Sequence, residues 1–158
     1  MKVKELMTSQ PEGCDPGTNL ARAVQLMWDA DCGVLPVVDS DMRVVGIITD
    51  RDICVALGTR NRRASDIRVA EVMRKPVETC AATDDVRVAL EKMRDRRVRR
   101  LPVCDPNGRL VGVVSLNDAV LATAIAKDVD SARVLDALRA ICAHRLPVPA
   151  EAETIAVG

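Results

Sequence analysis

The stretch VVGIITDRD at residues 44–52 occurs a second time, in altered form, as LVGVVSLND at residues 110–118. Each copy joins a short, β-branched apolar run to a hydroxyl residue, with an aspartate three positions later. The apolar run is typical of a buried strand, and the hydroxyl–aspartate spacing is typical of a helix start. Each copy is therefore expected to lead a strand directly into a helix N-terminus, whose unpaired N–H groups favour an anion such as phosphate.

The two copies lie 66 positions apart, and the same shift relates other segments of the chain. It takes Met7 to Met73, Cys14 to Cys80, and the tripeptide LPV at residues 35–37 to residues 101–103. The register holds without a gap from about residue 3 to residue 121, which indicates a duplicated unit. Two copies are too few for a solenoid, so we expect a pair of repeats related by a pseudo-two-fold axis.

Helical spacing and short apolar runs predict an α+β fold, in which each repeat is a small three-stranded sheet with two helices on one face. The first repeat is expected at residues 1–58, a linker at 59–65 and the second repeat at 66–127, with both repeats in one module. An amphipathic helix at 128–146 and a flexible tail at 147–158 follow. That helix needs an apolar partner, either its own chain or the same helix of a second chain.

Composition narrows the functional classes. The formal net charge is zero and hydrophobic residues make up 48% of the chain, which is a globular profile and argues against bulk nucleic-acid binding. No apolar run approaches the ~18 residues of a membrane span. The six cysteines form no Cys-x-x-Cys pair and there is one histidine, so we expect no metal site and reduced cysteines in a cytoplasmic protein. No nucleophile–base pair or phosphate-binding loop of the Walker type is visible, so neither catalytic residues nor an enzyme are expected.

The repeated motifs resemble those of tandem cystathionine β-synthase (CBS) domains, a pair also called a Bateman module. The resemblance covers about residues 1–122 and rests on GIITDRD at 46–52, GVVSLND at 112–118, LPVVD at 35–39, LPVCD at 101–105, ELMT at 5–8 and EVMR at 71–74. It implies a stand-alone regulatory module without a cofactor that binds AMP, ADP, ATP or S-adenosylmethionine between the repeats. It also implies a homodimer that senses this ligand and signals to a regulated protein by a conformational change.

The resemblance assigns the ribose hydroxyls to Asp52 and Asp118, and a phosphate or ribose oxygen to Thr49 and Ser115. It also places Arg99 and Arg100 near ligand phosphates, so that the clefts are asymmetric and the arginine-bearing side prefers the more charged ligands. Two further candidates follow from position. Arg51 opposes the helix dipole in a first helical turn, which indicates a role toward an anion, and Asn117 is its counterpart. The expected adenine pocket comprises Val77, Leu35, Pro36, Leu101 and Pro102.

Each assignment has a structural alternative. Thr49 and Ser115 could be N-caps completed by the aspartates, and the adenine residues could be plain core. Pro11 has no N–H to offer an adenine edge, which counts against a pocket there. Two other assignments stay open: Trp28 either flanks the core or lies at a dimer contact, and His144 is a surface or capping residue.

The arginines at 94–100 and the function as a whole also have alternatives. Arg94, Arg96 and Arg97 could form a solvated helix end. The functional alternatives are a constitutive interaction scaffold with non-functional clefts, or a nucleic-acid binder that uses the arginines at 60–63 and 94–100.

Overall fold

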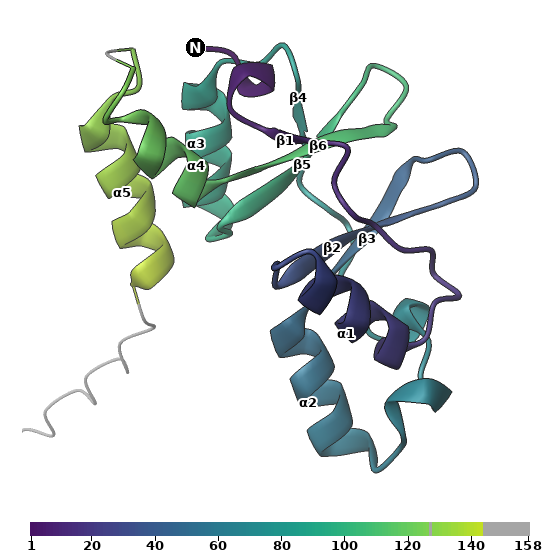
Figure 1. Ribbon diagram of the computed structural model, residues 1–158. Coiled ribbons are helices and arrows are strands. Elements are labelled where there is room, and N and C mark those ends of the chain that lie inside the picture. Colours follow the sequence, from purple (N-terminus) through teal and green to yellow (C-terminus); the bar gives the residue numbers. More distant parts are fainter. Residues whose placement is uncertain (127, 144–158) are drawn as a thin grey trace, which may run out of the picture.

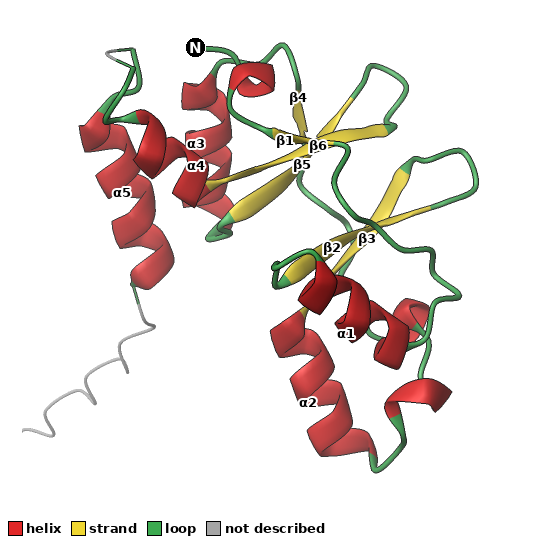
Figure 2. Cartoon of the chain, in the orientation of Figure 1, coloured by secondary structure: helices red, strands yellow, loops and turns green. Residues whose placement is uncertain are grey.

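The computed structural model describes residues 1–126 and 128–143, and Figures 1 and 2 show two similar units, each with a hairpin of strands and helices beside it. The helices are α1 (Leu20–Asp29), α2 (Asp50–Arg60), α3 (Val86–Arg96), α4 (Leu116–Ala122) and α5 (Ser131–Cys142). The strands are β1 (Thr8–Ser9), β2 (Val34–Val38), β3 (Val44–Thr49), β4 (Cys80–Ala81), β5 (Arg100–Cys104) and β6 (Leu110–Ser115). The predicted α+β fold is confirmed, including the helix that follows the second repeat. His144 and the predicted tail at 147–158 lie outside the described residues.

The two hairpins have the same register, as the shift of 66 predicts. In the first, Val34 lies opposite Thr49, and in the second Arg100 lies opposite Ser115. Both ladders also slip at the same place, between the last two residues of β2 and of β5. The alternation of buried and half-buried residues along β3 and β6 is identical, because one face of each strand packs on helices.

The sheets differ from the predicted pair of three-stranded sheets. The second unit contains a four-stranded sheet in the order β1-β6-β5-β4, whereas β2 and β3 form a two-stranded sheet. At the places that β4 and β1 occupy, the first unit has single bridges, Cys14 to Val37 and Arg74 to Ile47. Prolines at 11, 16 and 76 flank these bridges, and a proline cannot donate a ladder hydrogen bond. The outer strands are therefore reduced to bridges in this unit.

The first residues of each repeat pack on the unit formed by the other repeat. The 3₁₀ turn Val3–Glu5 packs on the second unit, where the Val3 amide donates to the Asp84 carbonyl at 2.9 Å. The equivalent turn Val69–Glu71 packs on the first unit, where the Val69 amide donates to the Thr18 carbonyl at 2.8 Å. Both valines have no exposed surface. The repeat boundaries at 1–58 and 66–127 remain a prediction. In the folded chain, each unit also includes the 3₁₀ turn that begins the other repeat.

Two apolar cores stabilise these units. The first includes Leu20, Met27, Leu35, Ile48 and Ile67, and the second includes Leu90, Met93, Leu101, Val114 and Val134. Burial of such side chains contributes about 1.5–3 kcal/mol each. The cores place β3 and β6 so that both strands end where a helix begins, which positions the hydroxyl–aspartate motifs.

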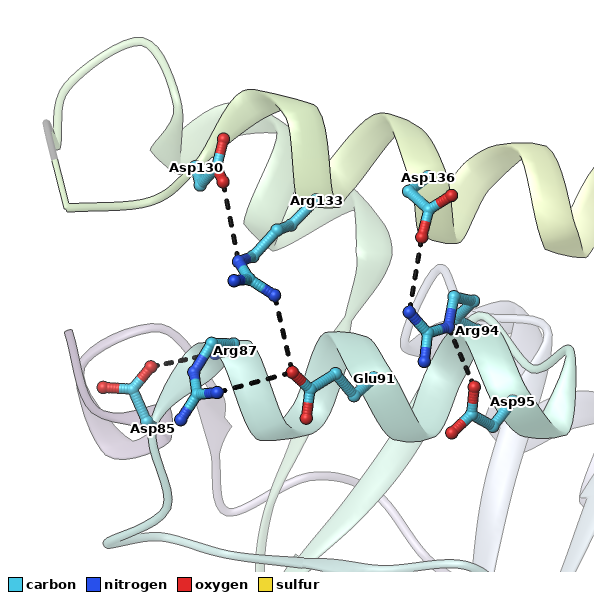
Figure 3. A network of polar contacts seen from close by, with 8 residues as sticks. All are labelled: Asp85, Arg87, Glu91, Arg94, Asp95, Asp130, Arg133 and Asp136. Atoms are coloured by element: carbon cyan, nitrogen blue, oxygen red, sulfur yellow. Dashed lines mark hydrogen bonds and ion pairs between the residues drawn. The ribbon is translucent and has the colours of Figure 1, made fainter.

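Helix α5 packs against α3 and α4 of its own chain, which is one of the two partners expected from the sequence. Asp130 caps its N-terminus by accepting from the Ala132 amide at 2.9 Å. Val134 and Ala137 are buried on α3 and α4. Ion pairs border this contact, from Arg94 to Asp136 and from Arg133 to Glu91 (Figure 3). Within residues 1–126 and 128–143, every helix is too short or too polar to cross a membrane.

Candidate ligand cleft

Both hydroxyl–aspartate motifs form the capping box expected of a helix start. The Asp52 amide donates to Thr49 Oγ1 at 3.2 Å, and Thr49 donates to Asp52 Oδ2 through its amide at 3.1 Å and its hydroxyl at 2.7 Å. In the second copy the Asp118 amide donates to Ser115 Oγ at 3.2 Å, and Ser115 donates to Asp118 Oδ2 through its amide at 2.8 Å and its hydroxyl at 2.7 Å. The capping interpretation is therefore confirmed in both copies, and it occupies only the Oδ2 atom of each carboxylate.

The second carboxylate oxygen distinguishes the two copies. Asp52 Oδ1 accepts two hydrogen bonds from the guanidinium of Arg74, from Nε at 2.7 Å and from Nη2 at 2.5 Å. Asp118 Oδ1 has no hydrogen-bond partner within the described part of the chain. A carboxylate can accept from two vicinal hydroxyls, and only Asp118 has an oxygen left to do so.

Asp118 lies in a cleft of about 380 Å³ between the two units. The first repeat supplies Thr8, Gln10, Pro11, Glu12, Asp31 and Val34, and the second supplies Arg100, Val113, Ser115 and Asp118. Strand pairing places the start of β5 directly opposite the end of β6, which brings Arg100 beside Ser115. The cleft thus combines hydroxyls, a carboxylate, a guanidinium and apolar side chains, as expected for a site that takes a polar small molecule.

The structure brings together three of the predicted site residues, Ser115, Asp118 and Arg100. Arg51 and Asp52 instead line a separate hollow of about 420 Å³ between α2 and the segment 71–74, which includes Arg74. Asn117 and Arg99 are exposed, and the Arg99 carbonyl accepts from the Leu116 amide at 2.8 Å, at the start of α4. These residues lie on different surfaces, and of the predicted phosphate or ribose residues only Arg100 and Ser115 line the Asp118 cleft together.

The predicted adenine residues are mostly core. Leu35 and Leu101 have no exposed surface, and Pro36 and Pro102 are also buried, so these four can shape a cleft only from behind. Val77 is half-buried and lines another hollow of about 460 Å³ beside Cys80 and Asp105. The apolar side chains that do line the Asp118 cleft include Val34, Val113 and Pro11. Pro11 was expected to count against a pocket, and it lines this one as an apolar surface that offers no N–H.

Several cleft residues were not identified from the sequence, among them Thr8, Val34, Glu12 and Asp31. A usable signal was present for two of them. Under the shift of 66, Thr8 corresponds to Arg74 and Val34 corresponds to Arg100. The exchange of an uncharged side chain for arginine at equivalent positions marks places where the two copies differ in charge and in side-chain contacts.

The arginines at 94–97 are engaged in structural contacts. Arg94 pairs with Asp95 and with Asp136 of α5, and the hydrogen bond that its guanidinium donates to Asp95 raises the pKa of that guanidinium (Figure 3). Arg96 pairs with Glu78 at 3.0 Å, and Arg97 ends α3 in the left-handed conformation. This confirms the interpretation of a helix end for these three residues.

The six cysteines are all free. Burial raises the pKa of the Cys14 thiol to about 11 and that of Cys80 to about 12, because the thiolate would lose its hydration. Burial also raises the pKa of Cys104. Among residues 1–126 and 128–143, no group of three potential metal ligands was found.

Comparison with known proteins gives the family. The profile of the CBS domain matches residues 3–59 and again 69–124. The uncharacterised protein YlbB of Bacillus subtilis is 38% identical over 125 residues, which span 77% of this chain and 81% of that protein. The CBS domain pair of protein MJ0100, solved with 5'-methylthioadenosine and S-adenosyl-L-methionine, has a TM-score of 0.72 at 26% identity over 78% of this chain and 96% of that chain.

A CBS domain protein of unknown function from Thermoplasma acidophilum, TA0289, has a TM-score of 0.74 at 26% identity. It covers 89% of this chain and 75% of that chain. The profile matches reproduce the two repeats found in the sequence, and the solved structures reproduce their pairing. The chain belongs to the CBS domain family, with two CBS domains in tandem.

Proposed function

We propose that this protein is a regulatory module that binds an adenosine compound at Asp118 and transmits binding to a protein partner. The observation on which this rests is the cleft in which Ser115, Arg100 and the free oxygen of Asp118 meet. The chemistry suits a nucleoside, because Asp118 Oδ1 can accept from the ribose hydroxyls while Val34 and Val113 lie against the base. The MJ0100 pair, which is 26% identical, was solved with two adenosine compounds and supports this class of ligand.

The charge of the cleft favours adenosine compounds with few phosphates. Its lining includes the carboxylates of Glu12, Asp31 and Asp118 and the guanidinium of Arg100. A triphosphate would bring several negative charges close to these carboxylates, whereas AMP offers one phosphate to Arg100 and S-adenosylmethionine is cationic at sulfur. We therefore expect AMP or S-adenosylmethionine to bind more tightly than ATP, contrary to the preference for charged ligands expected from the arginines alone.

Ligand binding in the cleft can change the relative position of the two units, because both repeats line it. Val34 begins β2 of the first unit, while Arg100 and Asp118 belong to the second. A ligand that contacts both units stabilises one relative position over others, and a partner that binds that position responds. Binding and relay need no bond-making step, so we propose a module without catalytic activity. Its six free cysteines suit the reducing cytoplasm.

The partner of the first unit is proposed to be a second copy of the chain. Val24 is 44% exposed and Trp28 82% exposed on α1, whereas Leu90, the counterpart of Val24, is 4% exposed beneath α5. Aromatic and aliphatic side chains on one open helix face are typical of an interface. Replacing Trp28 by arginine, the residue at the equivalent position 94, is expected to convert a dimer to a monomer in analytical ultracentrifugation.

Calorimetric titration with AMP, S-adenosylmethionine and ATP tests the ligand proposal. The native protein should bind at least one of the first two saturably, and Asp118→Asn should weaken that binding by about tenfold or more, since a charge-assisted contact is lost. Asp136→Asn, which neutralises an exposed carboxylate on α5, is the matched control and should bind normally.

Two outcomes would contradict the proposal. Absence of binding by all three ligands favours the scaffold with non-functional clefts. Binding of RNA that falls steeply with salt, without nucleotide binding, favours the nucleic-acid alternative.

A further inference from the structure

The side chain of Arg74 lies where the other copy of the repeat has a threonine. Arg74 pairs with Ile47 through the Arg74 amide at 2.8 Å and the Ile47 amide at 3.1 Å. Thr8 pairs in the same way with Val113, the counterpart of Ile47. The two backbones are therefore equivalent, and only the side chains differ. Thr8 lines the open cleft at Asp118, whereas the guanidinium of Arg74 binds Asp52.

The carboxylate of Asp52 has no capacity left for a ligand. Its Oδ2 atom accepts from Thr49, and its Oδ1 atom accepts both hydrogen bonds from Arg74. The Asp52 side chain is 8% exposed while that of Arg74 is 66% exposed, so the guanidinium covers the carboxylate from the solvent side. A ribose would have to displace Arg74 before it could reach this oxygen.

The hydrogen bonds between Arg74 and Asp52 indicate how much weaker a nucleoside should bind at Asp52. A hydrogen bond to a charged group strengthens binding or stability by about tenfold to a hundredfold, and Arg74 makes two such bonds to one atom. Exposure of Arg74 weakens the pair through solvent screening, which favours the lower end of this range. A nucleoside at Asp52 is thus disfavoured by about tenfold or more relative to one at Asp118.

We propose that Arg74 is an internal plug that closes the Asp52 site, so that each chain takes a single adenosine ligand, at Asp118. This inference rests on the proposed function for the nature of the ligand. It adds that the duplication has produced one working site and one site inhibited by the chain itself.

The experiment measures AMP stoichiometry by calorimetry in a series of variants. At AMP concentrations that just saturate the Asp118 site, the native protein should bind one AMP per chain, Asp118→Ala none, and Asp52→Ala one. Arg74→Thr, which introduces the residue of the other copy, should raise the stoichiometry to two. Arg74→Thr combined with Asp118→Ala should regain one site, and further addition of Asp52→Ala should abolish it. Arg43→Thr combined with Asp118→Ala is the matched control, since Arg43 is an exposed arginine in the β2–β3 turn, and it should bind nothing.

Each contrary outcome is distinct. Two equal sites in the native protein, with one lost in Asp52→Ala, would overturn the plug while the proposed function stands. Weaker binding in Arg74→Thr at a site that depends on Asp52 would show that Arg74 contacts the ligand. Binding that appears only in Arg74→Thr would support the plug and overturn the proposed site at Asp118. Absence of binding in every variant, with circular dichroism showing native folding, would overturn both.

Discussion

The two halves of the chain have equivalent backbone structures, but different side chains and helices pack over them. In the first, Arg74 occupies the oxygen of Asp52, and the outer face of α1 and α2 is open. In the second, the oxygen of Asp118 faces a cleft, and α5 covers α3. The contrast shows that a repeated motif preserves the local structure more strictly than the site. Capping depends on residues three positions apart, while the state of each site depends on residues distant in sequence.

If the cores are equivalent, matched truncations should have equal effects. Leu35→Ala and Leu101→Ala each remove a fully buried side chain at equivalent positions. Each should lower the free energy of unfolding by about 2–5 kcal/mol, through lost burial and the cavity left behind. Chemical denaturation followed by circular dichroism measures both. Values that differ by more than the spread of repeated measurements would break the equivalence of the two cores.

The reactivity of the cysteine thiols tests whether equivalent positions are buried in both halves of the chain. Cys14 and Cys80 are equivalent, and burial raises the pKa of Cys14 from 9.0 to about 11 and that of Cys80 to about 12. Such a shift lowers the thiolate population near neutral pH by about a hundredfold or more. A thiol reagent should therefore modify the exposed Cys54 and Cys142 first. Because the folded pKa values are raised, stability should fall as pH rises above the ordinary thiol range.

Mass spectrometry of peptides after brief labelling identifies the modified cysteines, and labelling in denaturant is the control. Equal labelling of Cys14 and Cys54 in the folded protein would contradict the buried environment of Cys14.

The cover that α5 gives to the second unit can be weakened by one substitution. Val134→Ala removes two methyl groups from a side chain that is 5% exposed against the core, so stability should fall by about 1–2 kcal/mol. Leu135 is 46% exposed on the same helix, and Leu135→Ala should change stability by less than about 1 kcal/mol. Thermal and urea unfolding compare the pair. An equal effect of both would mean that α5 does not pack through Val134.

Removal of each capping hydroxyl separates helix capping, which Thr49 and Ser115 share, from ligand binding, which is expected only at Ser115. Thr49→Ala and Ser115→Ala both delete an oxygen that accepts from the backbone at 3.2 Å, and each should lower stability by about 0.5–2 kcal/mol. Only Ser115→Ala is expected to weaken AMP binding as well. Urea unfolding and calorimetry on the same samples test both expectations. A loss of affinity in Thr49→Ala would indicate that the site at Asp52 also functions.

The smallest effect is expected at the ion pairs between α3 and α5. Arg94 and Asp136 lie 3.4 Å apart with side chains that are 41% and 61% exposed (Figure 3). Asp136→Asn should change the free energy of unfolding by less than about 1 kcal/mol, and high salt should remove the difference. Unfolding at low and high ionic strength measures this. A larger effect that persists in salt would show that the pair contributes more to the α5 contact than Val134 does.

Much of the architecture follows from local patterns. The constant shift of 66 predicts that two hairpins have the same register, and Val34–Thr49 and Arg100–Ser115 confirm it. The three-stranded sheets were wrong in detail, because prolines near Cys14 and Arg74 shorten the outer strands of the first unit. In the candidate site, Ser115, Asp118 and Arg100 are near one another in sequence and were identified. Thr8 and Asp31 come from distant segments and were not.

The sequence by itself determined the duplication, the strand-to-helix junctions and the capping by Thr49 and Ser115, because these depend on periodicity and short spacings. The tertiary structure alone decided that the first residues of each repeat pack on the other unit and that α5 packs on its own chain. It also decided the difference between the aspartates. Arg74 reaches Asp52 across 22 positions of sequence, while no residue of the described segments donates to Asp118 Oδ1. Spacing along a chain cannot predict such contacts, because they depend on which backbone segments folding brings together.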